Sequence, residues 1–407
     1  VCSNCGHTTF DATPIGEGTA ESPYQIANAG HLFWFADKVN NDFENFKDAN
    51  AVLTADIVVN DGTFAADGTF TATGASEPST PIEWLIIGRF DMSPYGYRGA
   101  FDGQGHTISG LYANYRYSGL VGLSAGECKI KNVGVINSYF DGDKVGGICG
   151  NAGNNTEISN CYSSNVICKG SCVGGILGLA TNNGVSIVNC YSTASLIGVE
   201  DWAEVGGIAG ESGSTTNCYT TYGNATGWSK SEINCEANVS LERFASGEIA
   251  YKLNGSVDGE GNWTAGATDG TQKWYQKLGE NGDSYPVLAA AEGNTVYEQK
   301  TIDCGGTVVA CNYYNTEEED VTQPHAYQVL LDENSNPVFV WSEEYTSAAL
   351  QLVCSHNAEH TANVEVTLGE GITSAVTTPA TCTATGVRTY TATATYESET
   401  YAGTKEV

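Results

Sequence analysis

Basic residues are scarce in this chain, and no long apolar run occurs in it. Lys and Arg number 17 against 48 Asp and Glu in 407 residues, which gives a formal net charge of −31. Nucleic acid and anionic membrane surfaces are therefore poor partners, because both repel a surface of the same sign. No apolar run approaches the roughly 18 residues of a membrane-spanning helix, so we expect no membrane insertion. The acidic residues are spread along the chain, which is typical of a solvated surface.

Long helical patterns are also few, whereas glycine is abundant. The chain contains 49 glycines, and only 16% of its residues are charged. This composition favours an all-β protein with many turns, and the length suggests two or three domains. The single methionine, Met92, lies inside the chain. The sequence begins as though processed or cut, and we interpret it as a piece of a longer secreted polypeptide.

The stretch from Gly119 to Gly227 contains four copies of one sequence repeat. Each copy opens with a Gly-x-x-Gly tetrapeptide and carries a later asparagine as a second marker. The openings are Gly119-Leu-Val-Gly122, Gly147-Ile-Cys-Gly150, Gly175-Ile-Leu-Gly178 and Gly207-Ile-Ala-Gly210. The asparagines, 28, 29 and 28 residues apart, are Asn132, Asn160, Asn189 and Asn217. A fixed period between about 20 and 50 residues is typical of solenoids, propellers and arrays.

The content of the repeat favours a parallel β-helix among these architectures. Short apolar runs such as Val145–Ile148 and Ser186–Val188 are separated by Gly, Asn and Ser. None has a helical period long enough for an α-solenoid. A coil of this length fits about three short strands and three turns, at roughly 3.3 Å per strand residue. We therefore predict a right-handed parallel β-helix, in which equivalent residues stack in ladders about 4.8 Å apart.

Two ladders follow from this geometry. We predict that the four asparagines stack in consecutive coils with their side chains inside and their amides bonded along the stack. Three cysteines each follow one of these asparagines directly, namely Cys161, Cys190 and Cys218, and Val133 takes the equivalent place in the first coil. Because valine substitutes for cysteine there, we predict that these thiols are buried in the core and reduced.

The tetrapeptide openings resemble the GLUG motif, a repeat of secreted and wall-attached bacterial proteins that include large adhesins. The resemblance covers roughly residues 16 to 290, because several upstream segments are similar to those that usually precede such repeats. These segments are Gly18–Ile26, His31–Val39, Leu53–Ile57 and Phe101–Ile108. The resemblance implies a capped β-helix, but it says little about function, because the family is defined by its scaffold.

Helical segments are predicted at both ends of the β-helix. Residues 28–47 place apolar side chains on one side of a helix, and Ser240–Leu253 begins with a capping serine. Such caps would cover core residues and unpaired strand edges that otherwise promote aggregation. We therefore assign residues 1–14 to an N-terminal extended segment and residues 15–300 to a β-helix with N- and C-terminal caps.

From about residue 301 the pattern changes to strands separated by turns. Asn363–Leu368 and Thr389–Tyr396 are two such strands, and their spacing is typical of a β-sandwich. The segment resembles the small Ig-like modules that are repeated in wall proteins of gut Firmicutes. We assign residues 301–407 to an Ig-like β-sandwich module.

Five residues outside the repeats are candidates for a disulfide or a metal site. Cys2 and Cys5 form a CxxC pair, which is compatible with half a zinc site, a redox pair or a plain disulfide. Cys354 and Cys382 are expected to lie close together and to form either a disulfide or, with His360, part of a metal site. The disulfide is favoured because four clear metal ligands are not visible.

Several signatures of catalysis are missing from the sequence. HExxH and the phosphate-binding glycine loop do not occur in it. Lys129, Lys131, Lys144 and Lys169 do not recur at one repeat position, as the basic row of a polysaccharide lyase would require. We predict that the protein is not an enzyme and uses no cofactor. A carbohydrate-active β-helix enzyme with an unrecognised site is an alternative.

These observations predict an extracellular, cell-surface protein that serves adhesion, display or assembly. Its expected partners are a protein or glycan ligand on a surface, or copies of itself joined head to tail. A further alternative is the structural subunit of a self-assembling filament, in which an extended segment of one chain fills an exposed sheet edge of the next. Cys2 or Cys5 would then meet Cys382 of the neighbouring chain.

Overall fold

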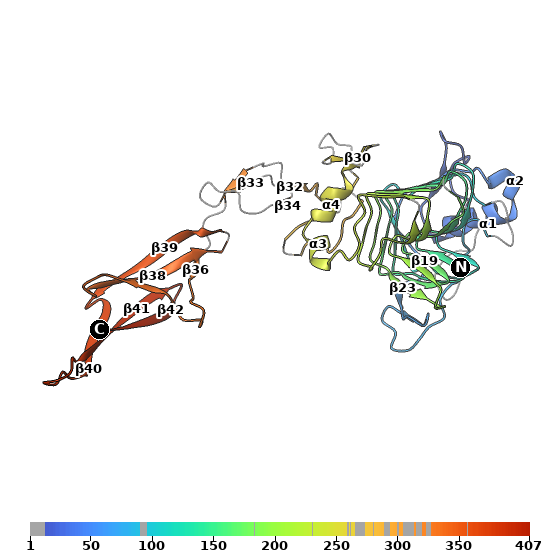
Figure 1. The fold of residues 1–407 in the computed structure, drawn as a ribbon. Helices are drawn as coiled ribbons and strands as arrows, with labels where there is room; N and C mark the ends of the chain where they lie inside the picture. Colours follow the sequence, from blue (N-terminus) through green and yellow to red (C-terminus); the bar gives the residue numbers. More distant parts are fainter. Residues whose placement is uncertain are drawn as a thin grey trace. The chain divides into compact units, whose positions relative to one another are not determined.

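The computed structural model describes residues 13–89, 96–182, 184–229, 231–258, 260, 262–264, 273–279, 281–288, 294–298, 301–303, 313–314, 320–322, 327–355 and 357–407. They divide into two compact units, within the ranges Val1–Glu298 with Tyr313–Glu317 and Gln299–Asn312 with Glu318–Val407. The first unit is a stack of β-coils with small helices, and the second is a β-sheet region (Figure 1). The predicted all-β architecture, a capped β-helix followed by a β-sheet region, is confirmed.

Each regular coil of the β-helix crosses five parallel sheets in a fixed order. The coil from Lys129 to Ala152 contributes one strand to each sheet, and the next coils repeat the order. Strands pair in parallel with those of the following coil, so that Ile130 lies beside Ile158. The expectation of about three strands per coil is wrong. The strands are only two to four residues long, because turns interrupt the backbone after each one.

The strands are distributed over the sheets as follows. Sheet 1 contains β1 (Tyr24–Ile26), β2 (Ala51–Leu53), β6 (Ala100–Asp102), β11 (Lys129–Lys131), β16 (Glu157–Ser159), β21 (Ser186–Val188), β26 (Ser214–Thr216) and β29 (Glu232–Ile233). Sheet 2 contains β3 (Ile57–Val58), β7 (Thr107–Ser109), β12 (Gly134–Ile136), β17 (Tyr162–Ser164), β22 (Tyr191–Ser192) and β27 (Tyr219–Thr220). Sheet 3 contains β8 (Tyr112–Asn114), β13 (Tyr139–Asp141), β18 (Ile167–Gly170) and β23 (Ser195–Gly198).

The remaining two sheets complete each coil. Sheet 4 contains β9 (Tyr117–Ser118), β14 (Lys144–Gly146), β19 (Cys172–Gly174) and β24 (Glu204–Gly206). Sheet 5 contains β10 (Val121–Ser124), β15 (Cys149–Ala152), β20 (Leu177–Ala180), β25 (Ala209–Ser212) and β28 (Thr226–Ser229). In the described part of the first unit, three two-stranded pairs lie outside these sheets: β4 (Gly62–Phe64) with β5 (Phe70–Ala72), β30 (Ser256–Val257) with β31 (Trp263–Thr264), and β32 (Tyr297–Glu298) with β34 (Tyr313–Tyr314).

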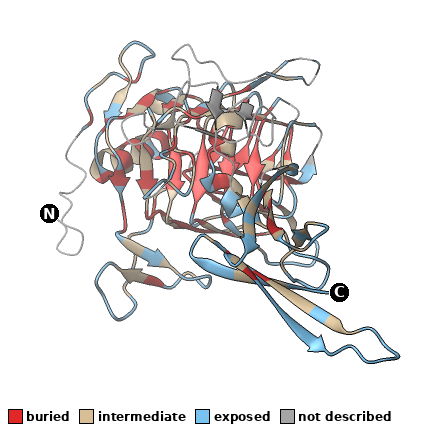
Figure 2. Ribbon diagram, turned by 90° about the vertical axis from the view of Figure 1, so that its left-hand side faces the viewer, coloured by how far each residue is buried: buried red, intermediate tan, exposed pale blue. Residues whose placement is uncertain are grey.

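The core of the first unit runs through the centre of the coils. Side chains that point inward from successive strands form rows, and Figure 2 shows these buried strands in red. Phe140 in β13 is fully buried between Ala113 and Cys168 of the adjacent coils. Burying apolar area of this kind contributes roughly 25 cal/mol per Å². Stacked rows therefore supply most of the driving force that holds the coils together.

Two helices cover the N-terminal end of the stack. α1 (Ala29–Asn41) begins at Asn28, whose side chain accepts a hydrogen bond from the backbone N–H of His31. The chain then turns at Asp42 into α2 (Phe43–Phe46). Leu32 and Phe35 of α1 are fully buried in the same core as the coils. The helix predicted over residues 28–47 is therefore confirmed, with a break at Asp42.

Two further helices, α3 (Leu241–Ala245) and α4 (Glu248–Leu253), follow the last coil. Ser240 caps α3 by accepting a hydrogen bond from the N–H of Arg243, as its sequence position predicted. Gly247 separates the two helices with a φ of 91°, a left-handed conformation that glycine adopts without steric cost. Within the described ranges, no helix has the length and apolar character that crossing a membrane requires.

The second unit contains long strands in place of short ones. They are β36 (Tyr327–Val329), β37 (Phe339–Trp341), β38 (Ser347–Cys354), β39 (Asn357–Leu368), β40 (Gly371–Thr378), β41 (Val387–Tyr396) and β42 (Glu399–Glu406). Hydrogen bonds join them in the order β36-β38-β39-β40-β41-β42, with β37 also paired to β38. β33 (Thr301–Asp303) and β35 (Asp320–Thr322) form a separate parallel pair.

The path through this sheet bends between β39 and β40, which pair in parallel at only two positions. Strands on the two sides of the bend pack against each other, because Leu350 of β38 and Ala394 of β41 share one buried cluster. The Tyr396 hydroxyl donates across the same gap to the carbonyl of Tyr327, at 3.0 Å. The region thus has two packed layers that remain hydrogen-bonded through the β39–β40 contact.

Candidate functional site

The repeat asparagines stack at a corner of the coil, between sheets 1 and 2. Asn160 Nδ2 donates to Asn132 Oδ1 at 3.2 Å, and Asn217 Nδ2 donates to Asn189 Oδ1 at 2.8 Å. All four asparagines have φ between 49° and 54°, a left-handed conformation that asparagine tolerates better than most residues. Asparagine is therefore used both for the turn and for the bond along the stack.

The expectation that these four side chains lie inside the β-helix is wrong for three of them. Only Asn217 is fully buried, whereas Asn132, Asn160 and Asn189 are partly exposed. A corner residue with positive φ points away from the core row, so its amide reaches the next corner instead. Asn217 is buried because the C-terminal cap covers it, and its Nδ2 also donates to the carbonyl of Lys252 at 2.9 Å.

The three cysteines that follow the asparagines line the interior. Cys161, Cys190 and Cys218 are fully buried and carry free thiols. Each Sγ lies 3.2–3.3 Å from the carbonyl oxygen of the residue two positions earlier, so the thiol hydrogen has an acceptor. Burial, followed by hydrogen bonding with the neighbouring thiols, raises the pKa of Cys190 well above its ordinary value. The Cys190 thiol therefore stays protonated and is a poor nucleophile.

The residue after each cysteine points out of the β-helix and forms a second ladder. Tyr162, Tyr191 and Tyr219 are in register on sheet 2. The rings of Tyr162 and Tyr191 stack with centroids 5.0 Å apart and planes 8° from parallel. In the coil before them this position is Gly134, where a Cβ would lie 2.2 Å from Cζ of Tyr162. Glycine is required there because the ring of Tyr162 occupies the space that a Cβ would need.

The C-terminal cap covers this tyrosine ladder. Trp274 packs on the rings of Tyr162 and Tyr191, with centroids 6.0 and 5.4 Å away, and Phe244 of α3 lies 5.4 Å from Tyr191. The hydroxyl of Tyr191 donates to the carbonyl of Pro286 at 2.8 Å. The cap therefore closes the end of the stack and also clamps the outer face of sheet 2. We call this apolar contact the tyrosine clamp.

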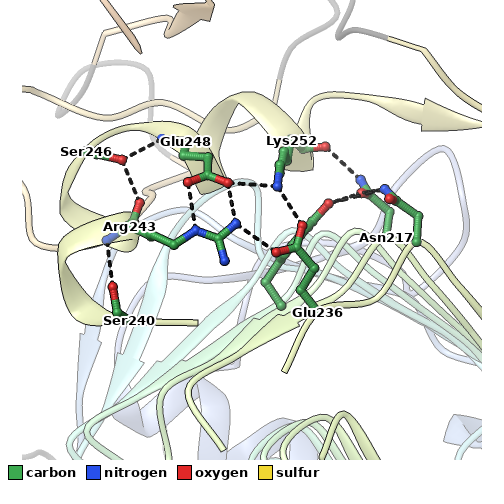
Figure 3. Close-up of polar contacts among 9 residues, drawn as sticks. Asn217, Glu236, Ser240, Arg243, Ser246, Glu248 and Lys252 are labelled. Atoms are coloured by element: carbon green, nitrogen blue, oxygen red, sulfur yellow. Dashed lines mark hydrogen bonds and ion pairs between the residues drawn. The ribbon is translucent and has the colours of Figure 1, made fainter. Parts of the chain in front are cut away.

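Four charged residues fasten the two cap helices to the last coil (Figure 3). Arg243 of α3 lies between Glu248 of α4 and Glu236 of the coil, 2.7 Å from a Glu236 oxygen. Lys252 lies 2.6 Å from Glu236 and 2.8 Å from Glu248. Every carboxylate thus contacts both cations. We call these four residues the cap ion network.

Both carboxylates of the network have lowered pKa values. Hydrogen bonds from Arg243 hold the pKa of Glu248 below its ordinary value of 4.5, against the effect of partial burial. Burial raises the pKa of Glu236, but hydrogen bonds from Lys252 and Arg243 outweigh it, and the net pKa is lowered. The network is therefore fully ionised at neutral pH and stabilises the cap.

Sequence reasoning missed the tyrosine clamp and the cap ion network, although one signal was present. The Cys-Tyr dipeptide recurs at residues 161–162, 190–191 and 218–219, which predicts one inward and one outward ladder. The covering residues Trp274 and Phe244 belong to no repeat. A second polar ladder was also missed, in which Asn165 Nδ2 donates to Asn137 Oδ1 at 2.6 Å.

The expectation that Cys354 and Cys382 lie close together is wrong. Cys354 ends β38, opposite the start of β39. β40 begins where β39 ends and continues in the same direction, so its eight residues carry the chain roughly 25 Å farther away. Cys382 lies in the turn beyond β40 as an exposed, free thiol.

The metal-site alternative for these residues is not supported either. His360 lies on β39, next to Thr361, which pairs with Val353. Across the described ranges, no group of three or more His, Cys, Asp or Glu residues is placed to hold a metal ion. Cys2 and Cys5 lie outside the described residues, so their chemistry stays a prediction.

Comparison with known proteins supports the repeat assignment. Residues 144–167 match the family model described as the GLUG motif. This segment runs from β14 to the start of β18 and includes the second tetrapeptide opening, so the resemblance stated from the sequence is confirmed there. No curated protein and no solved structure matches the chain.

Proposed function

We propose that this protein is a non-enzymatic, extracellular component of a cell surface, where it serves adhesion, display or assembly. The observation that carries the proposal is the combination of a GLUG motif with a β-helix that is capped at both ends. Core rows, side-chain ladders and an ion network all join neighbouring coils. We therefore expect the β-helix to be rigid. Such a scaffold suits the presentation of side chains at fixed spacing along its outer sheets.

The surface charge supports the same proposal. A net charge of −31 on 407 residues disfavours binding to anionic lipid. The proposed partner is a protein or a glycan on an opposing surface. The long, largely exposed strands of the second unit provide a separate module that the β-helix would display.

The proposal is tested by locating the protein on intact cells. Antibodies raised against the β-helix should label non-permeabilised cells of the source organism, and mild protease treatment should remove the label. An antibody against a cytoplasmic enzyme provides the control, because it should label permeabilised cells only. Labelling that requires permeabilisation contradicts the proposal.

The adhesive role requires a second measurement. Purified protein is immobilised, and its binding to a panel of glycans and extracellular proteins is measured by biolayer interferometry. We expect saturable binding to at least one member of the panel. Surface exposure without such binding leaves display or assembly as the function, whereas turnover of a panel glycan contradicts the non-enzymatic assignment.

A filament subunit is the second candidate, because the second unit ends in an exposed edge strand. β42 pairs with β41 on one side, and no other strand within the described ranges pairs with it. Unpaired N–H and C=O groups on such an edge accept a strand from another chain. Sedimentation over a wide concentration range tests this, since a protein that stays monomeric throughout is no filament subunit.

A further inference from the structure

A pocket of about 430 Å³ opens on the outer face of sheet 1 near the N-terminal end of the β-helix. Its volume lies within the range of small-molecule sites, roughly 300–1,000 Å³. The lining residues come from three consecutive coils, just before or at the start of β2, β6 and β11. They are Asp48, Asn50, Arg98, Gly99, Ala100, Glu127 and Lys129.

The strand register explains why the pocket is hollow. Ala100 pairs with Lys129 of the next coil, and its N–H donates to the side-chain oxygen of Asn50 in the previous one, at 2.8 Å. The middle coil contributes the small residues Gly99 and Ala100 next to Arg98, whereas the two neighbouring coils contribute longer polar side chains. Gly99 packs so closely on the coil above that a Cβ would lie 2.0 Å from the carbonyl oxygen of Ala49.

The two cations of the pocket differ from the other basic residues of the coils. Lys131, Lys144 and Lys169 each lie 2.9–3.2 Å from an aspartate oxygen. Within the part of the chain that the structure describes, neither Arg98 nor Lys129 has such a carboxylate partner. Nε of Arg98 is buried and has no hydrogen-bond acceptor there. A buried donor without an acceptor costs about 1–3 kcal/mol.

Arg98 is held by a backbone hydrogen bond and by packing of its aliphatic side-chain carbons. Its backbone N–H donates to the carbonyl of Lys47 at 2.8 Å, and its aliphatic stem packs over Gly126, where a Cβ would lie 3.4 Å from Cδ. The backbone and the aliphatic part of Arg98 are thus held beside the pocket that its side chain lines. A planar, preorganised guanidinium is the group that binds carboxylates most specifically, through two parallel hydrogen bonds.

The remaining polar groups restrict the ligand further. Asp48 and Glu127 place two carboxylates beside the two cations, so the charges of the lining residues balance. Asp48 also lies 3.4 Å from Nζ of Lys47, outside the lining. A dianion such as phosphate is opposed by these carboxylates, whereas a single carboxylate on a hydroxylated ring can use them as acceptors for its O–H groups. The amide nitrogen of Asn50 is a further donor, because its oxygen is already used by Ala100.

We propose that this pocket binds a sugar acid of the hexuronate class, with the ligand carboxylate on Arg98 and Lys129 and the ligand hydroxyls on Asp48 and Glu127. Such a site gives the β-helix an affinity for acidic glycans, which the net charge of the protein would otherwise disfavour. The proposal concerns the pocket alone and holds wherever the protein is located.

Isothermal titration calorimetry of the full chain with sodium D-glucuronate tests this proposal. We expect saturable binding at one site per chain, no binding of D-glucose, and weaker binding of inorganic phosphate than of glucuronate. Absence of glucuronate binding overturns the proposal. Phosphate binding as tight as that of glucuronate also overturns it, because the site would then be a general anion site.

Four variants identify the residues. Arg98→Gln and Lys129→Gln should each weaken glucuronate binding about tenfold or more, since each removes a charge-assisted hydrogen bond worth at least about 1.4 kcal/mol. Ala100→Gln fills the floor without changing any charge and should abolish binding. The matched control is Lys131→Gln, which lies on the same strand but pairs with Asp102.

Circular dichroism and thermal unfolding establish that each variant is folded before it is titrated. Unchanged binding in both Arg98→Gln and Ala100→Gln places the ligand elsewhere and overturns the assignment. A loss in Lys131→Gln as large as that in Arg98→Gln also overturns it, because the effect would then follow the net charge and not the pocket.

Discussion

The two units of this protein reach stability in different ways. In the β-helix, strands of two to four residues each bury a side chain in a row that continues through the neighbouring coils. In the second unit, strands of up to twelve residues bury few side chains, among which are Leu350, Ile372 and the small Ala394. β40 is exposed from Thr373 to Thr378. Repetition thus provides a continuous core with short strands, whereas the long strands depend more on their hydrogen-bond ladders.

The largest expected effect follows from a break in one core row. Phe140→Ala should lower the free energy of unfolding of the β-helix by about 3–5 kcal/mol, because it leaves a cavity between two coils. Hydrogen exchange measured by mass spectrometry should show faster exchange throughout β11 to β20 and unchanged exchange in β38 to β41. Equal loss of protection in both units would mean that they unfold as one.

The matched substitution lies in the second unit. Ile372→Ala removes a side chain that is 1% exposed and packs on Ala348 and Ala392. It should cost about 2–4 kcal/mol and increase exchange in β38 to β42 alone. Faster exchange in β11 to β20 of this variant would contradict the independence of the two cores.

The asparagine corner allows a finer test within the β-helix. Asn160→Gly keeps the left-handed turn but removes the bond to Asn132, so we expect a loss of about 1 kcal/mol. Asn160→Ala also forces an alanine to a φ near 49°, which adds about 1–2 kcal/mol. Urea unfolding of both variants measures the difference. Equal stability of the two would show that the turn conformation is not what asparagine provides.

The pH dependence of the C-terminal cap is a smaller effect. Glu236 and Glu248 have folded-state pKa values below the ordinary 4.5. Their contribution is therefore present above pH 4.5 and is lost as the pH falls through the lowered values. Because the pairs are partly exposed, we expect about 1 kcal/mol in total. Hydrogen exchange of α3 and α4 as a function of pH measures it.

The control for this prediction is Arg243→Gln. The variant should lose most of the pH dependence below pH 4.5, because Glu236 and Glu248 each lose one of their two cations. Exchange in β38 to β41 should not change in either protein over the same range. A wild-type cap whose protection is constant with falling pH contradicts the role of the network.

The smallest expected effect concerns reactivity and not stability. Iodoacetamide should modify Cys382 rapidly, since its thiol is exposed. Cys161, Cys190 and Cys218 should react only after unfolding, and burial also raises the pKa of Cys149, to about 12. Peptide mapping at neutral pH checks this. Modification of Cys190 in the folded protein would show that the stack opens locally.

The sequence predicted the parts of the fold that repeat. Asn160 and Asn189 could be placed in one stack because their spacing equals the length of a coil, and Cys161 and Cys190 followed as inward neighbours. The tyrosine clamp could not be predicted in the same way, since Trp274 and Pro286 reach Tyr191 from outside the repeat. In the second unit, the position of Cys382 depends on the parallel β39–β40 pairing, for which a local sequence pattern gives no signal.

The tyrosine clamp also restricts how the chain can change in evolution. β-Helices lengthen by duplication of whole coils, and a copy inserted before Gly134 would leave the contacts of Trp274 and Phe244 intact. An insertion between Tyr162 and Tyr219 would shift one ring by a full coil and place it beyond the reach of its partners. The last coils and the C-terminal cap therefore form one packed block, in which a coil cannot be added without breaking these contacts.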